Sequence, residues 1–362
     1  MGRGRLLTLT VAFCLVVVAV CCAATETVNT KAGPYKNLAG KFGVAVVRYN
    51  WQDAKRNRPV PVKIYYPVTG DGPLPVVIFS PGLGGTREGY EYLGRHWASW
   101  GYVSVHLQHL GSDDAVWKTT ALADRIRAMR AVLLDPAVSL NRPLDVSFAI
   151  DTIEKMNRDQ GPLKGRLDLG KIGIAGHSFG AWTTLAAVGQ VFILPGGKEV
   201  SLADPRIKAA VPMSAGPPAR QGQLDRAFGS IKVPCLHMTG TLDASPLLDT
   251  PASDRRVPYD HIKGGDQYLV TFKDGDHMIF SGHVASTWQV PGSGGDPAKD
   301  GLFQDLILQS TMAFWDAYLK RDAEARQWLS QGGFKAVLDE NGTLEAKLKA
   351  VAEPTSKVPK AK

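Results

Sequence analysis

The sequence predicts an α/β fold: a doubly wound, mostly parallel sheet of about eight strands with helices on both faces. Short apolar, β-branched runs recur along the chain, and from the third run onward most are separated by segments with helical periodicity. The first two runs have no helix between them, which predicts an antiparallel start to the sheet. With 44% hydrophobic and 21% charged residues, the 362-residue chain can bury the core of one such domain.

The predicted elements follow these runs in order. The strands are expected at residues 44–49, 60–67, 74–80, 102–107, 171–176, 207–213, 233–238 and 267–272. The helices are expected at residues 90–100, 121–134, 143–157, 178–190 and 302–320. In the third helix, Phe148, Ile153 and Met156 belong to an apolar stripe of the width that a core-facing helix shows, so we assign these side chains to the core.

An N-terminal targeting segment precedes the fold. Arg3 and Arg5 stand before an apolar stretch, residues 6–22, and Ala24 ends a run of small residues. This pattern predicts a cleaved signal peptide, residues 1–24, and a secreted or periplasmic protein. Because the apolar stretch is nearly long enough to span a bilayer, an uncleaved membrane anchor is the alternative.

The remaining chain divides into a linker (25–39), the α/β domain (40–335) and a lysine-rich tail (336–362) expected to be a frayed helix ending in disorder. The whole sequence contains 42 Lys and Arg and 34 Asp and Glu, and the basic residues are scattered rather than gathered into a stripe. This distribution argues against a nucleic-acid partner. It is compatible with peripheral contact with an anionic membrane or envelope surface. The oligomeric state is left open.

Cysteine usage predicts no internal disulfide. Cys14, Cys21 and Cys22 would leave with the signal peptide, so the mature chain would keep Cys235 alone. Cys235 lies in an apolar run typical of a buried strand, which predicts an inert core thiol rather than a reactive one.

The stretch "KIGIAGHSFGAW" at residues 171–182 is typical of a nucleophile elbow. It places Ser178 between Gly176 and Gly180, with a buried strand before it and a helix after it. Small residues are needed two positions either side because the strand turns sharply into the helix. Ser178 is therefore the predicted nucleophile, and the alternative is a serine that only completes a tight turn.

A catalytic serine needs a base, and in this arrangement the base follows the last strand. His277 lies in the loop that leaves the carboxyl end of the predicted strand 267–272, so it is the predicted base. His283 is the alternative if that loop bends unexpectedly. His261 precedes the strand, which puts it at the wrong end of the sheet.

The base needs an acid that fixes its tautomer. Asp243 follows the predicted strand 233–238 at its carboxyl end and is the predicted acid. Asp249 and Asp254 lie deeper in the same loop, where solvated side chains are expected. Asp276 is adjacent to the base in the sequence, and its carboxylate is expected to point away from the His277 imidazole.

An oxyanion hole requires two backbone N–H groups aimed at the developing charge. One is expected from Phe179, the residue after the nucleophile, and the other from Leu83 in the glycine-rich loop that follows strand 74–80. That loop is not a dinucleotide-binding fingerprint, because Arg87 stands where the third glycine belongs. No cofactor is therefore expected, and no His-Glu-x-x-His or similar spacing predicts a metal site.

Four stretches carry a resemblance to a known family: "FSPGLGGTREGYEYLGRHWASWGYVSVHLQHLGSD", "RPLDVSFAID", "GHSFGAW" and "FWDAYLKRDAEARQWL". They resemble α/β-hydrolases of the group that holds platelet-activating-factor acetylhydrolases and bacterial predicted dienelactone hydrolases, and more distantly cutinase-like polyester hydrolases. The resemblance touches most of residues 40–330. It implies a serine esterase with the triad Ser178, Asp243 and His277 and the oxyanion amides of Leu83 and Phe179.

Two features depart from that family. Animal acetylhydrolases of this type place the acid after the strand that follows the nucleophile helix, where this chain reads "VPMSAGPP" with no carboxylate. The acid is thus expected one strand later, as in dienelactone-hydrolase and cutinase-like enzymes. True dienelactone hydrolases use a cysteine nucleophile, whereas this chain carries serine, so neither named substrate transfers directly.

The sequence therefore predicts hydrolysis of carboxylic esters, such as acyl lipids, through an acyl-enzyme intermediate. Lactones or polyesters are alternative substrates, and a non-catalytic binding protein on the same fold is the alternative function. Residues 112–141 are expected either to cap the site or to form an ordinary helix after a strand. Trp288 is placed to line a pocket beside the His277 loop.

Overall fold

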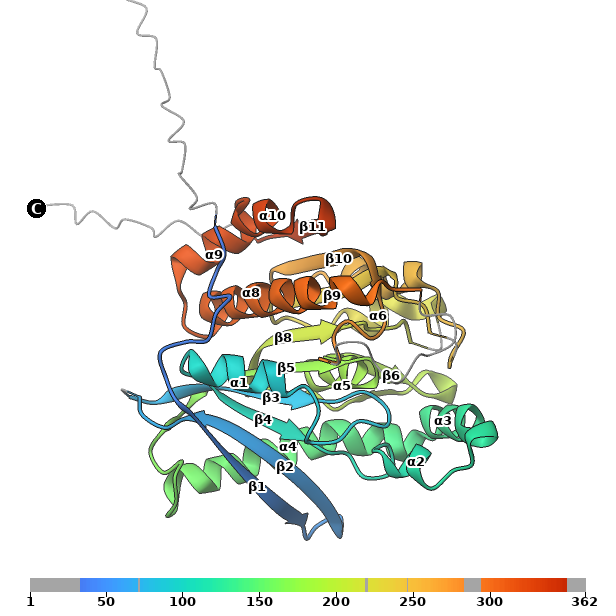
Figure 1. Ribbon diagram of the computed structural model, residues 1–362. Helices are drawn as coiled ribbons and strands as arrows, with labels where there is room; N and C mark the ends of the chain where they lie inside the picture. Colours follow the sequence, from blue (N-terminus) through green and yellow to red (C-terminus); the bar gives the residue numbers. More distant parts are fainter. Residues whose placement is uncertain (1–32, 71, 219–220, 246, 283–293, 350–362) are drawn as a thin grey trace, which may run out of the picture.

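The structure, a computed structural model, describes residues 33–70, 72–218, 221–245, 247–282 and 294–349 (Figure 1). The predicted signal peptide, the alternative base His283 and the pocket residue Trp288 lie outside these residues. Within the described part of the chain, no helix is both long and apolar enough to cross a bilayer.

The centre of the protein is a sheet of nine strands in the order β1-β2-β4-β3-β5-β8-β9-β10-β11. The strands are β1 (Val44–Asp53), β2 (Arg58–Pro67), β3 (Leu74–Ser80), β4 (Val103–Leu107), β5 (Leu167–His177), β8 (Ile207–Met213), β9 (Cys235–Leu242), β10 (Gln267–Asp276) and β11 (Gly342–Lys347). The run from β4 to β10 is parallel, and β2 pairs antiparallel with both β1 and β4. These pairings confirm the mostly parallel sheet and its antiparallel start.

Helices cover both faces of this sheet. Successive side chains of β3 point to opposite faces, and both sets are apolar, so each face needs a covering layer. Val76 and Ile78 join one apolar cluster with α4 and α5, whereas Val77 and Phe79 join another with α1 and α8. The helices are α1 (Glu91–Ser99), α2 (Ala115–Lys118), α3 (Arg125–Leu134), α4 (Pro136–Arg158), α5 (Phe179–Ala187), α6 (Leu224–Phe228), α7 (Val257–His261), α8 (Asp300–Tyr318), α9 (Ala323–Ser330) and α10 (Gly333–Leu338). Two short strands, β6 (Val191–Ile193) and β7 (Glu199–Ser201), form a separate hairpin. The doubly wound architecture predicted from the sequence is confirmed.

The helix expected at 143–157 begins seven residues earlier, at Pro136. Asp135 caps it by accepting a 2.8 Å hydrogen bond from the Ala137 amide, and Pro136 occupies the first turn, where a proline is tolerated. Pro143 therefore lies inside the helix, at a cost of about 3 kcal/mol. Burial of Val146, Ala149, Ile150 and Ile153 offsets this, since each larger side chain contributes about 1.5–3 kcal/mol.

The C-terminal boundary expected at residue 335 is wrong. Beyond it, β11 adds an antiparallel strand to β10, with Gln267 opposite Lys347 and Phe272 opposite Gly342. Leu344 packs against the apolar cluster of the α8 face. The strand covers backbone groups that β10 would otherwise expose at the sheet edge, so the folded domain extends past the predicted start of the tail.

Several histidines are buried in this fold, and their burial predicts acid sensitivity. Burial lowers the pKa of His96, His109 and His237 to about 4 and that of His106 to about 3. Their folded pKa values lie below the unfolded value, so their contribution to stability is complete above about pH 6.5 and is lost as the pH falls towards 4.

Denaturant unfolding at pH 7, 6 and 5 should therefore show a steadily falling midpoint. Each of the four histidines should remove about 1–2 kcal/mol from the free energy of unfolding by pH 5. An unchanged midpoint between pH 7 and 5 would contradict this expectation.

Candidate active site

Ser178 occupies a strained turn between β5 and α5. Its backbone has φ 56° and ψ −117°, a region that residues other than glycine rarely adopt. A Cβ on Gly176 would lie 2.3 Å from the Gly180 carbonyl oxygen, and one on Gly180 would lie 1.9 Å from the Ser80 carbonyl oxygen. Both positions therefore require glycine, which is the steric reason predicted for the sequence pattern.

His277, the residue after β10, faces this serine. Its Nε2 lies 2.9 Å from Ser178 Oγ, and its side chain is 16% exposed, so the pair can be reached from solvent. On its other side, Nδ1 lies 2.7 Å from Oδ1 of Asp243, which follows β9 and is fully buried. The structure thus brings together the three side chains that the sequence pointed to, in the order serine, imidazole, carboxylate.

Asp243 is held in its charged form by its neighbours. Burial would raise its pKa, but His277, Arg255 and the Ser214 hydroxyl together hold the pKa below its ordinary value. Thr239 Oγ1 donates a 2.9 Å hydrogen bond to Oδ2. A carboxylate accepts the Nδ1 proton of His277, which leaves the Nε2 lone pair directed at Ser178.

Ser214 and Arg255 were not among the predicted site residues. Ser214, one residue past β8, donates a 2.7 Å hydrogen bond to Asp243 Oδ1 and lies 2.8 Å from His277 Nδ1. Arg255 is buried and donates to the backbone carbonyls of both Asp243 and Ser214, at 3.0 and 3.1 Å. The one signal available in the sequence was the stretch "VPMSAGPP", which contains Ser214 and lacks the carboxylate that the resembling family is expected to carry after this strand.

The backbone of His277 is anchored to the elbow by a chain of hydrogen bonds. Its carbonyl can only accept, so His177 Nε2, 2.8 Å away, donates to it. Burial lowers the pKa of His177 and keeps it neutral, so its Nδ1 accepts from Tyr90 Oη at 2.8 Å. Tyr90 Oη in turn accepts from the Gly82 amide at 3.4 Å. The base, the elbow and the loop after β3 are thereby fixed to one another.

The alternative acids are engaged elsewhere. Asp249 is 83% exposed and pairs with Arg130 of α3. Asp276 accepts the Met278 amide at 2.8 Å and so shapes the turn beside the base. Asp254 lies half-buried in the short helical turn Ala252–Arg256, where it accepts from Ser253 Oγ at 3.5 Å.

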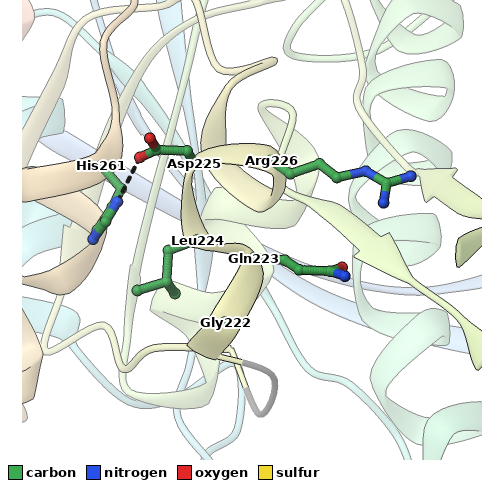
Figure 2. A pocket seen from close by; sticks show the side chains of 6 residues that line it. All are labelled: Gly222, Gln223, Leu224, Asp225, Arg226 and His261. Atoms are coloured by element: carbon green, nitrogen blue, oxygen red, sulfur yellow. Dashed lines mark hydrogen bonds and ion pairs between the residues drawn. The ribbon is translucent and has the colours of Figure 1, made fainter.

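Of the alternative bases, His283 lies outside the described residues, and His261 ends α7 away from the serine. Figure 2 shows His261 at a shallow surface hollow, where its Nδ1 lies 2.7 Å from Asp225. Both side chains are substantially exposed, which is typical of a surface ion pair. Among the described residues, no three His, Cys, Asp or Glu side chains converge as metal ligands.

The two predicted oxyanion donors lie on adjacent segments. Phe179 is the first residue of α5, where helix geometry leaves the N–H without an intrahelical partner. β3 and β5 are parallel neighbours, so the Leu83 loop leaves the same sheet edge as Ser178. A Cβ built on Gly82 would lie 3.5 Å from Ser178 Cβ, which places this loop against the nucleophile.

Residues 112–141 border this edge of the sheet. Trp117 of α2 donates from its indole to the Gly84 carbonyl at 3.1 Å, and Arg130 of α3 pairs with Asp249 at 3.3 Å. The segment thus contacts both the loop that carries Leu83 and the loop that follows Asp243. Several of its apolar side chains face solvent, among them Leu122 (78% exposed) and Leu134 (72%).

Comparison with known proteins agrees with this architecture. A family model described as platelet-activating factor acetylhydrolase, isoform II, matches residues 43–133. The platelet-activating factor acetylhydrolase of Cavia porcellus is 27% identical over 154 residues, which are 36% of this chain and 35% of that relative, so the match spans about a third of the relative's length. The segment matched by the family model contains Leu83 and ends before Ser178, so the arrangement of the three side chains rests on the structure.

Proposed function

We propose that this protein hydrolyses carboxylic esters, with Ser178 as nucleophile, His277 as general base and acid, and Asp243 as the acid that orients the base. The observation that carries the proposal is the geometry of His277. Its Nε2 lies 2.9 Å from Ser178 Oγ while its Nδ1 lies 2.7 Å from the buried Asp243 carboxylate. The likeness to the acetylhydrolase family supports an ester-cleaving hydrolase in general.

The proposed reaction has two steps. His277 Nε2 takes the hydroxyl proton as Ser178 Oγ attacks the ester carbonyl, and the resulting oxyanion accepts hydrogen bonds from the amides of Leu83 and Phe179. When the intermediate collapses, His277 returns the proton to the leaving alcohol. Water then attacks the acyl-enzyme with His277 again as base, releasing the carboxylic acid and restoring the serine.

The proposed substrate is an ester with an apolar acyl chain. Exposed apolar side chains at Leu122, Ile126 and Leu134 lie on the segment that borders the site, and Leu248 lies in the loop after Asp243. The Cavia porcellus relative is named platelet-activating factor acetylhydrolase, which is the name of an ester-cleaving enzyme. Lactones and polyesters are further candidate substrates, and the predicted signal peptide suits a substrate met outside the cytosol.

Incubation with a fluorophosphonate probe tests the proposal directly. We expect stoichiometric labelling, with the added mass on the peptide that contains Ser178, because the activated serine attacks phosphorus as it would an ester carbonyl. Turnover of p-nitrophenyl butyrate should fall in proportion to the fraction of protein that is labelled. A series of acyl-chain lengths, with a lactone, a phospholipid and a polyester film, then identifies the ester class.

The same experiment separates an enzyme from a binding protein. Well-folded protein that neither labels nor turns over any ester would contradict the proposed hydrolase and favour a non-catalytic binding role. Labelling at a different serine would contradict the assignment of Ser178 alone.

A further inference from the structure

A fully buried cluster of charged and polar side chains lies beneath the loop that carries Leu83. It contains Arg142 and Asp145 of α4, His109 after β4, and Ser80 at the end of β3, each exposed by no more than 1%. The reaction proposed above uses none of these groups. Burying charged groups costs several kcal/mol each in lost hydration, so the cluster needs a reason beyond stability.

Arg142 joins the two segments that supply the proposed oxyanion amides. Its Nη2 donates to the carbonyl of Pro81 and, at 3.2 Å, to Ser80 Oγ, both on the segment leading to Leu83. Its Nε donates at 2.8 Å to Thr183 Oγ1 in α5, and its guanidinium carbon lies 4.2 Å from the centre of the Phe179 ring. One planar group thus fixes the loop and the start of α5 relative to each other.

Arg142 also reaches the segment that borders the site. Its Nη1 donates to Ser112 Oγ at 2.7 Å, and the Ser112 carbonyl accepts the Gly84 amide at 2.8 Å. Gly84 directly follows Leu83, so the loop is held on both sides of the proposed donor. The guanidinium can make these contacts at once because its five N–H groups diverge in a plane.

His109 and Asp145 extend the cluster, and Arg58 of β2 donates to both oxygens of Asp145 at 2.9 and 3.0 Å. Burial, with the Arg142 charge adding to it, lowers the pKa of His109 to about 4, so the imidazole is neutral at pH 7. Its Nδ1 donates to Asp145 at 2.9 Å, so its Nε2 accepts from Ser80 Oγ at 3.0 Å, and Ser80 in turn accepts from Arg142. Every hydrogen bond in this chain has a consistent direction, which is how a buried polar network becomes rigid.

From these contacts we infer that Arg142 is a positioning residue for the oxyanion hole, an inference that rests on the proposed esterase function. Arg142 sets the Pro81 peptide and the first turn of α5, and thereby the distance and angle between the amides of Leu83 and Phe179. An oxyanion forms only after attack on the carbonyl, so misplaced amides raise the barrier without weakening substrate binding.

Arg142→Lys tests the inference, because lysine keeps the charge but cannot reach the same set of acceptors. We expect kcat to fall about 10- to 100-fold with KM changed less than about threefold. The affinity for a boronic acid, whose tetrahedral adduct carries the oxyanion, should fall by a similar factor. Ser80→Ala, a smaller change in the same network, should lower kcat about 3- to 10-fold by the same route.

Asp316→Asn serves as the matched control. Asp316 is an equally buried charge on α8 that accepts from Tyr102 and pairs with Lys320, on the opposite face of the sheet from α4. The Asp316→Asn substitution should lower the melting temperature while leaving kcat and boronic-acid affinity unchanged. This control separates general destabilisation from an effect on the oxyanion.

The outcomes are distinguishable. Active wild-type protein together with an Arg142→Lys variant of normal kcat and boronic-acid affinity would overturn the positioning role alone. If Arg142→Lys fails to fold, Ser80→Ala decides, and normal kcat in that variant overturns the inference. Wild-type protein that neither labels nor hydrolyses esters overturns the proposed function and this inference together.

Discussion

Ser178→Ala should lower kcat for p-nitrophenyl butyrate by about four to six orders of magnitude, because it removes the proposed nucleophile and leaves only the oxyanion amides and substrate binding. KM should change little. Alanine keeps the Cβ and meets the same backbone strain at φ 56° as serine, so the melting temperature should stay within a few degrees of wild type. Initial rates at high enzyme concentration, with fluorophosphonate labelling in parallel, measure the loss.

Ser310→Ala is the control for this substitution. Ser310 is buried in α8 and donates to the Leu306 carbonyl, so its loss tests removal of a buried hydroxyl away from the site. It should leave kcat unchanged. Retention of more than about one per cent of wild-type kcat in pure Ser178→Ala protein would mean that another residue is the nucleophile.

The elbow could be predicted because its cause is local. Gly176 and Gly180 are required by backbone contacts within four residues of each other and with the neighbouring strand β3. Asp243 and His277 could be predicted for a related reason, since the carboxyl ends of parallel strands meet at one edge of a sheet, and each follows such a strand.

The roles of Ser214 and Arg142 could not be predicted, because they depend on contacts between elements far apart in the chain. The missing carboxylate in "VPMSAGPP" drew attention to the segment after β8, but only the structure shows that Ser214 lies 2.7 Å from Asp243. Arg142 and Asp145 sit three residues apart on a helix, a spacing equally typical of a surface ion pair. Only the packing of α4 under the loop after β3 shows that both are buried.

The C-terminal strand was missed for another physical reason. Residues 336–362 are rich in lysine and lack aromatic residues, a composition that favours disorder. β11 nevertheless forms because the outer edge of β10 offers a row of backbone partners about 75 residues earlier in the chain. The composition of a segment indicates only its general tendency to be disordered, whereas the pairing of β11 depends on the sheet edge that β10 forms.

Asp243→Asn should lower kcat by about three to four orders of magnitude. The amide nitrogen or oxygen would face His277 Nδ1 without a negative charge, so the imidazole would no longer be held with Nε2 free to accept the serine proton. Ser214 donates to one oxygen of the carboxylate and Thr239 to the other, and an amide can accept at only one of these two positions. Its NH2 group would therefore face either the donors at the His277 side or the Thr239 hydroxyl. A pH–rate profile together with a thermal melt distinguishes a lost base from a lost fold.

Ser214→Asp introduced into the Asp243→Asn protein should restore kcat by at least about tenfold, because the new carboxylate comes from a position whose Oγ already lies 2.8 Å from His277 Nδ1. The backbone there has φ 60°, a conformation that aspartate tolerates better than most residues. Thr239→Asp in the same background is the matched control, since Thr239 contacts the far oxygen of Asp243. No recovery at position 214 in folded protein would show that β8 cannot supply the acid, and equal recovery in the control would show that the position of the carboxylate does not matter. In the wild-type background the same Ser214→Asp change should lower activity, because two carboxylates would then share one imidazole.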